Sequence, residues 1–241
     1  MHTVLVYHSI TSRSDQISDE AISPRRFEQQ LCWLSRWRAV VPLTETLHRS
    51  EKDRLVGISF DDGYRNNLTV ALPLLEKFSL PMTLFVIAGA VDADGYLSTD
   101  ELREISRHPL VTIGAHGLWH RHFTGLSPDS ARFELIESRR LLEDVIGRKV
   151  ELMAWPYGEC DPEVERLSAE CGYRASWSVW KGTNGPYSRW RVPLGRRDNL
   201  LRFVAKSSGV YALSKAKWHR FKDRHERGKT RVGKPSLADS F

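Results

Sequence analysis

The chain has 241 residues, of which 41% are apolar. It is long enough to bury one sizeable hydrophobic core, and we expect a single domain. No run of about eighteen apolar residues occurs, which argues against a transmembrane helix. The first eight residues lack the charged region and long apolar run of a signal peptide. We therefore expect a soluble, cytoplasmic protein.

Charge is unevenly distributed along the chain. Of the 36 Lys/Arg and 30 Asp/Glu, residues 214–241 hold nine and three, which leaves 27 of each sign in the remainder. The sequence therefore predicts a neutral domain over residues 1–213 and a basic tail over residues 214–241. Such a tail is suited to peripheral contact with anionic membrane lipid, and a solvated, poorly ordered terminus is the alternative. Trp218 and Phe221 are the only Phe, Trp or Tyr residues among the charged positions of residues 215–239, so we expect no nucleic-acid partner.

The three cysteines, Cys32, Cys160 and Cys171, match no CxxC spacing. This spacing argues against a disulfide framework and against a cysteine-based zinc site. We expect these residues to be buried thiols or thiols without a chemical role.

Short β-rich runs alternate with amphipathic stretches along most of the chain. This order is typical of parallel strands joined by crossover helices, and it predicts a wound α/β sheet or barrel. The predicted strands, with an eighth candidate at Arg191–Leu194, are Thr3–Tyr7, Ala39–Pro42, Leu55–Phe60, Met82–Ile87, Val111–Ala115, Val150–Ala154 and Tyr173–Ser176.

The first predicted helix begins at Ser23 and Pro24, an N-cap residue followed by proline at the first helical position. Phe27, Leu31 and Leu34 then recur at helical spacing. No internal repeat or Gly/Ser-rich linker marks a second domain. The further predicted helices are Asn66–Phe78, Ser98–Arg107, Ser127–Ile146 and Asp161–Cys171.

Two carboxylates follow the predicted strand at Leu55–Phe60. Asp61 and Asp62 come directly after it and precede Gly63. In parallel α/β folds, ligands bind at the carboxyl ends of the strands. Successive side chains there point in different directions, so one aspartate could hold a metal while the other faces a bound water. An Asp-Asp-Gly run alone is also an ordinary turn signal.

Two histidines, His116 and His120, follow the predicted strand at Val111–Ala115. Imidazoles four residues apart on a helical turn or compact loop can reach one ion, and nitrogen ligands suit zinc and its neighbours. Together with Asp62 they would form a three-ligand site with an open position for water. His122 could substitute as a ligand, but we expect it to face solvent or to support the site.

A third segment, Trp155–Gly158, follows the predicted strand at Val150–Ala154. Its proline and glycine predict a tight turn that could aim a backbone N–H into the pocket. In this order and spacing, Ser59–Gly63, His116–His120 and Trp155–Gly158 resemble the first three motifs of the polysaccharide deacetylase family. This family is also called the NodB-homology family or carbohydrate esterase family 4. The resemblance spans about residues 3–205.

The resemblance implies an α/β fold, a distorted (β/α) barrel of seven or eight strands, and a divalent metal ion, with zinc expected. Carried over by position, it implies that Asp62, His116 and His120 bind the metal. It also implies that Asp61 is the general base and that the Tyr157 backbone N–H contributes to the oxyanion site.

The general acid marks one departure from the family pattern. Many members take it from a histidine in a late LeuxHis motif, which this chain lacks between residue 180 and the tail. Instead, Tyr7 and His8 follow the first predicted strand and resemble the circularly permuted branch, which includes exopolysaccharide deacetylases of biofilm systems. The resemblance implies that His8 is the general acid, and a strand-capping role is the alternative.

The third motif marks a second departure. Many members carry an arginine there that orients the base, whereas this chain has Ala154 and Trp155. Arg191 could supply a guanidinium to Asp61 from a neighbouring strand, as a similar segment of the permuted branch suggests. Trp155 and Trp177 could stack on a sugar ring or belong to the core.

These features together predict a metal-dependent hydrolase that removes N-acetyl groups from an N-acetylhexosamine-containing saccharide and releases acetate. The substrate class includes a polysaccharide, an oligosaccharide and a lipid-linked or nucleotide-linked sugar. The expected cytoplasmic location, with the tail near the inner membrane surface, favours a lipid-linked or nucleotide-linked sugar or an intermediate of exopolysaccharide biosynthesis. Two alternatives stay open: hydrolysis of another C–N bond or of O-acetyl esters, and a non-catalytic carbohydrate-binding relative.

Overall fold

The computed structural model describes residues 2–12, 18–209, 211 and 214. The predicted basic tail, residues 214–241, lies outside the described residues except for Ser214. Within the described part, no helix is both long enough and apolar enough to cross a membrane.

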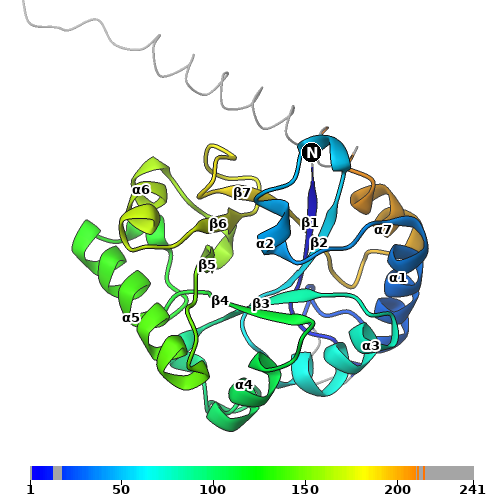
Figure 1. Ribbon diagram of the computed structural model, residues 1–241, viewed down its shortest axis with the longest axis horizontal. Helices are drawn as coiled ribbons and strands as arrows, with labels where there is room; N and C mark the ends of the chain where they lie inside the picture. Colours follow the sequence, from blue (N-terminus) through cyan, green and yellow to red (C-terminus); the bar gives the residue numbers. More distant parts are fainter. Residues whose placement is uncertain (1, 13–17, 210, 212–213, 215–241) are drawn as a thin grey trace, which may run out of the picture.

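Seven parallel strands form a closed barrel (Figure 1). They pair in chain order, and β7 then pairs with β1, which closes the ring. The predicted fold, a distorted (β/α) barrel of seven or eight strands in one domain, is confirmed. The strands are β1 (Thr3–Tyr7), β2 (Val56–Phe60), β3 (Met82–Val86), β4 (Val111–Ala115), β5 (Leu152–Ala154), β6 (Ala175–Ser178) and β7 (Arg189–Pro193).

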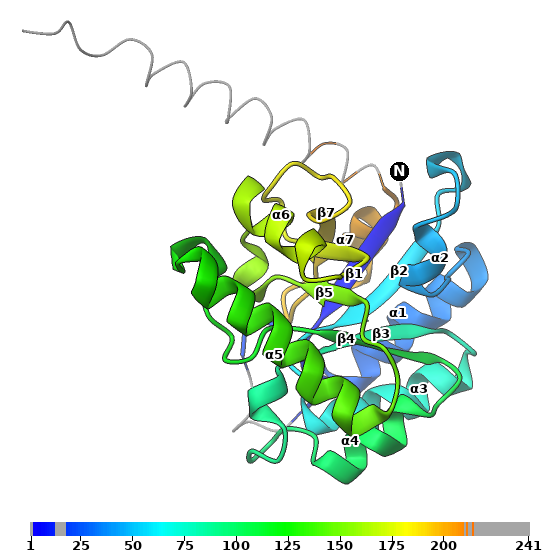
Figure 2. The ribbon, with the colours of Figure 1, turned by 60° about the vertical axis from the view of Figure 1, so that its left-hand side comes forward.

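Helices surround the strands, and α5 crosses one side of the barrel between α4 and α6 (Figures 1 and 2). The α-helices are α1 (Pro24–Trp37), α2 (Leu43–Thr46), α3 (Leu72–Lys77), α4 (Thr99–Ser106), α5 (Pro128–Ile146), α6 (Pro162–Glu170) and α7 (Leu200–Ser207). Short 3-10 turns and one π-helical turn, η3, complete the connections: η2 (Glu51–Asp53), η3 (Asn67–Ala71), η4 (Ala88–Ala90), η5 (Phe123–Gly125) and η6 (Pro156–Gly158).

The strands bury both faces, because alternate side chains point to the barrel interior and to the surrounding helices. In β2, Ile58 and Phe60 belong to the large core beneath the helices. By this alternation, Ser59 and then Asp61, just beyond the end of β2, face the interior. A smaller cluster from β1, β3, β5 and β6 fills that interior with Val4, Phe85, Leu152, Ala154, Ala175 and Trp177.

Helix α1 begins at Pro24, as predicted, and buries Phe27 on its inner face. The ring of Phe27 packs edge-on against those of Tyr7 and Phe60, at centroid distances of 5.1 and 5.7 Å. Tyr7 and Phe60 are the last residues of β1 and β2. The aromatic contacts therefore fix the two strand ends that lead into predicted site residues.

The predicted strand at Ala39–Pro42 is wrong. Among these residues only Val40 forms a bridge, an isolated one to Val56, and the chain then enters α2. Pro42 has no N–H to donate to a sheet, so the β-rich run ends in a helical turn instead. The eighth candidate strand is real, because β7 takes its place in the ring.

Other elements also differ from the sequence prediction. Strands β5 and β6 each begin two residues later than predicted, at Leu152 and Ala175. The single helix predicted over Asn66–Phe78 is divided into η3 and α3, because Pro73 cannot donate the α-helical hydrogen bond and the turn before it widens. Helix α7 was not predicted, although the Asn199 side chain caps it by accepting from the Arg202 backbone N–H.

Candidate functional site

The three predicted metal ligands converge at the carboxyl ends of β2 and β4. Oδ1 of Asp62 lies 3.6 Å from Nε2 of His116 and 3.6 Å from Nε2 of His120. One ligand atom from each residue lies within 4.8 Å of the others. This is the one such group of histidine, cysteine and acidic side chains found among the described residues.

This donor set fits a divalent cation. A separation of 3.6 Å is too long for a hydrogen bond, so the three atoms converge without bonding to one another. Nδ1 of His116 lies 2.7 Å from the Ala154 carbonyl oxygen. Because a carbonyl only accepts, Nδ1 carries the proton, which leaves the Nε2 lone pair directed at the cluster. One carboxylate oxygen and two imidazole nitrogens match the ligands of catalytic zinc sites.

Three residues at this cluster have a strained backbone conformation. Asp62, His120 and Tyr157 have φ values of 75°, 52° and 58°. This left-handed region is unfavourable for residues other than glycine, at a cost of about 1–3 kcal/mol each. The fold therefore holds three site residues in conformations that the chain alone would avoid.

Arg191 binds Asp61 through both terminal guanidinium nitrogens. Nη1 donates to Oδ1 at 2.6 Å, and Nη2 donates to Oδ2 at 2.7 Å. Arg191 is 0% exposed and Asp61 is 3% exposed, so this is a buried ion pair. The guanidinium carbon also lies 5.4 Å from the centroid of the Phe85 ring in the barrel interior. The structure thus places the β7 guanidinium against Asp61, and the roles of both residues in catalysis stay predictions.

The charges around Asp61 control its protonation. Burial raises the pKa of the Asp61 carboxyl, but Arg191, His116 and His8 together outweigh burial and lower it to about 2. Asp61 is therefore ionised at neutral pH and can only accept hydrogen bonds. Burial, followed by the charge of His116, lowers the pKa of His120. His120 is consequently neutral near pH 7, which is the form that binds metal.

His8 lies beyond the end of β1, close enough for its charge to act on Asp61. The buried Asn67 side chain donates to the His8 backbone carbonyl at 2.8 Å and so holds this segment. Nε2 of His8 lies 3.8 Å from Oε2 of Glu20, and its buried Nδ1 has no hydrogen-bond partner among the described residues. A cavity of about 380 Å³ opens beside His8, with Glu20 on its wall. The imidazole is therefore oriented at the rim, next to a space that a substrate group can enter.

Tyr157 lies beside His120, the second predicted histidine ligand. Its ring centroid is 4.5 Å from that of His120, and it stacks on His122 at 3.7 Å with an interplanar angle of 7°. His122 is exposed, bonds to Glu159 through Nδ1 at 3.1 Å and lies outside the ligand group. The oxyanion role of the Tyr157 backbone N–H stays a prediction.

Trp155 and Trp177 belong to the core, so the alternative that they stack on a sugar ring is wrong. Both side chains are 0% exposed. Nε1 of Trp155 donates to the Tyr187 carbonyl at 2.9 Å, and Trp177 packs against Phe85 inside the barrel.

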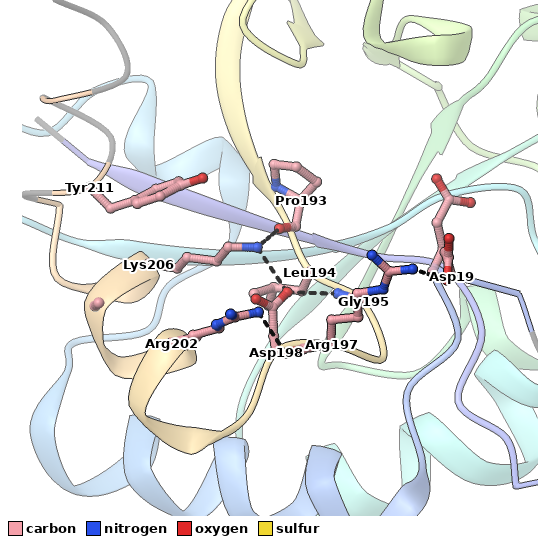
Figure 3. A pocket seen from close by; sticks show the side chains of 11 residues that line it. Asp19, Pro193, Leu194, Gly195, Arg197, Asp198, Arg202, Lys206 and Tyr211 are labelled. Carbon is pink, nitrogen blue, oxygen red and sulfur yellow. Dashed lines mark hydrogen bonds and ion pairs between the residues drawn. The ribbon is translucent and has the colours of Figure 1, made fainter. Parts of the chain in front are cut away.

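A separate cavity of about 550 Å³ lies beyond the end of β7, between α7 and the segment at Asp19 (Figure 3). Its polar side chains pair with one another. Nζ of Lys206 donates to Oδ2 of Asp198 and to the Pro193 carbonyl oxygen, each at 2.8 Å, and Oδ2 of Asp198 also accepts from the Gly195 backbone N–H. None of the predicted site residues lines this cavity, so it is separate from the predicted reacting centre.

Sequence reasoning missed two buried polar residues that hold the site loops. One is Asn67, described above, and the other is Glu134 on α5, which accepts hydrogen bonds from the backbone N–H groups of Leu118 and Trp119. Glu134 lies three residues after Ala131 on the buried face of α5. An acidic residue at a helical position where the periodicity requires an apolar one was the available signal.

We expect loss of either partner of the Asp61–Arg191 pair to destabilise the fold, because the remaining charge stays buried without compensation. Arg191→Met should lower the free energy of unfolding by about 3–5 kcal/mol. The double variant Asp61→Asn/Arg191→Met should lose less than the sum of the single variants. Urea unfolding measures all three, with the exposed Arg140→Met as a control that should change stability little, because water screens its ion pairs. Strict additivity would show that the two groups do not stabilise each other.

The family model for polysaccharide deacetylases matches residues 48–176. The chain is 25% identical over 199 residues to YxkH of Bacillus subtilis, a relative named as a polysaccharide deacetylase, covering 78% of this chain and 70% of that protein. It is 26% identical over 189 residues to the poly-β-1,6-N-acetyl-D-glucosamine N-deacetylase of Staphylococcus aureus, covering 70% of this chain and 64% of that protein.

The fold is shared with the deacetylase PplD of Streptococcus pyogenes, solved in complex with acetate. The TM-score is 0.77 at 20% sequence identity, and the match covers 86% of this chain and 97% of that one. The family model extends over more than half of the present sequence. The chain therefore belongs to the polysaccharide deacetylase family.

Proposed function

We propose that this protein is a metal-dependent hydrolase that removes N-acetyl groups from N-acetylhexosamine units of a saccharide, releasing acetate and leaving a free amine. The observation that carries this proposal is the convergence of Asp62, His116 and His120 beside the ionised Asp61. The staphylococcal relative, named as a deacetylase of an N-acetylglucosamine polymer, supports the substrate class. Zinc is the expected metal, because its usual ligands include histidine nitrogen and carboxylate oxygen.

Each residue of the site has a proposed task. Asp62, His116 and His120 would hold the cation, which supplies Lewis acidity that makes a water more acidic and polarises a carbonyl group. Asp61 takes a proton from the attacking water, and Arg191 keeps the Asp61 carboxylate in one orientation through two hydrogen bonds.

Two further groups act on the substrate in this proposal. The Tyr157 backbone N–H donates to the acetamide carbonyl oxygen as negative charge develops on it. His8 then donates a proton to the departing amine, which is a poor leaving group without one. The position of His8 just beyond β1, beside a cavity of about 380 Å³, supports this role.

We also propose residues 1–213 as the catalytic domain and residues 214–241 as a basic tail. The support is that every proposed site residue lies between His8 and Arg191, whereas the tail is distinguished by its excess of Lys/Arg.

The purified protein should release acetate from N-acetylglucosamine oligomers. Removal of divalent ions with a chelator, followed by desalting, should reduce the rate by about 100-fold or more, because the cation supplies several kcal/mol of transition-state stabilisation. Zinc should restore the rate, and an enzymatic acetate assay measures it. An undiminished rate in demonstrably metal-free protein would contradict the proposal.

His8→Ala should separate amide from ester hydrolysis. Loss of a general acid should slow acetamide hydrolysis by about 10²–10⁴-fold. An O-acetyl ester should be affected much less, because its alkoxide leaves with less help from an acid. The matched control is His108→Ala, which removes a histidine that pairs with Glu76 away from the site. Equal losses on both substrates would count against a general-acid role.

A further inference from the structure

The two histidine ligands are joined by a loop, residues 116–120, that has no regular secondary structure. Within it, Gly117 has a φ of 78° and His120 a φ of 52°. A free loop of this kind would place its histidines in many orientations. The contacts that hold this loop therefore decide whether the two imidazoles face Asp62.

The loop is held on two sides. On one side, the carbonyls of Gly117 and Leu118 accept from the backbone N–H groups of Ala88 and Gly89, at 3.1 and 2.9 Å. On the other side, the backbone N–H groups of Leu118 and Trp119 both donate to Oε2 of Glu134, at 2.8 and 3.0 Å. One carboxylate oxygen on α5 thus bridges two successive amides between the histidine ligands.

Glu134 is an unusual residue for its position. It is 2% exposed and lies on the inner face of α5, which crosses this side of the barrel (Figure 2). A carboxylate is rarely buried unless it is well paired, and charge-assisted bonds to backbone N–H groups are a strong form of pairing. Its second oxygen, Oε1, lies 3.6 Å from Nε of the exposed Arg121, just beyond the loop. All these partners belong to residues 118–121.

We propose that Glu134 is a positioning residue of the metal centre, which fixes the loop so that His116 and His120 are preorganised to bind the ion. This inference rests on the proposed metal-dependent function. Among the described residues, Glu134 bonds to the loop backbone and not to the three ligand atoms, so it acts through that backbone. Its removal leaves the three ligands in the chain but requires metal binding to order the loop. Losses of metal affinity of about 10–100-fold are typical when such supporting contacts are removed.

Helix α5 provides a matched control. Near its other end, Oε1 of Glu143 accepts from the Val150 backbone N–H at 2.8 Å and from Nε of Arg139 at 2.9 Å. Glu143 therefore also ties a loop to α5, but that loop carries no proposed site residue. Glu143→Ala removes a comparable contact at a position with no connection to the histidine pair.

The experiment is a titration of metal-free protein with Co²⁺, followed by its visible absorption spectrum, and with Zn²⁺ in competition with a chromophoric chelator. Glu134→Ala should bind both ions about 10–100-fold more weakly, with an altered Co²⁺ spectrum. Glu134→Gln keeps an oxygen that accepts both N–H groups, so it should recover much of the affinity. Glu143→Ala should bind as the wild type does, even where urea unfolding shows reduced stability.

If Glu134→Ala does not fold, Glu134→Asp replaces it, because the shorter side chain withdraws the carboxylate by about one C–C bond, ~1.5 Å. This variant should also lose metal affinity. Wild-type affinity and an unchanged Co²⁺ spectrum in the folded Ala or Asp variant would overturn the inference, as would an equal loss in Glu143→Ala. A wild-type protein that binds neither ion would instead contradict the proposed function itself.

Discussion

The parallel register of a closed barrel is the constraint on which the site depends. Tyr7 pairs with Phe60 and Val86 pairs with Ala115, so β1 to β4 end at a common rim. Residues that directly follow these strands meet there although they are far apart in the sequence. Arg191 comes from within β7 and reaches Asp61 because strand alternation directs both side chains inward. The pairing of β7 with β1 is therefore needed to complete the site as well as the ring.

Several energetically unfavourable features of this fold lie at the same rim. Three non-glycine site residues adopt left-handed backbone conformations, and two opposite charges are buried together. Such features persist only where the surrounding structure determines them strongly. Here the barrel interior packs around Arg191, while Asn67 and Glu134 hold the loops after β1 and β4. A rigid scaffold thus supports loops that would not hold their conformation alone.

Much of this arrangement could be predicted from the sequence. The strands are buried on both faces, so most of them stand out as short β-rich, largely apolar runs. Polar residues directly after these runs indicated a site at the carboxyl ends. The pairing of Arg191 with Asp61 was predictable only as a suggestion, because it depends on which strand closes the ring. Sequence periodicity could not reveal the left-handed backbone of Tyr157, and it could not tell that Trp177 faces inward. The false strand at Ala39–Pro42 shows that local β propensity does not determine pairing.

In the proposed function, Asp62, His116 and His120 hold a divalent ion. The most direct test is elemental analysis of the purified wild-type protein beside Asp62→Ala, each reconstituted with zinc and freed of excess metal. We expect about one ion per chain in the wild type and its loss in the variant. No bound metal in the reconstituted wild type, or full occupancy in both proteins, would contradict it.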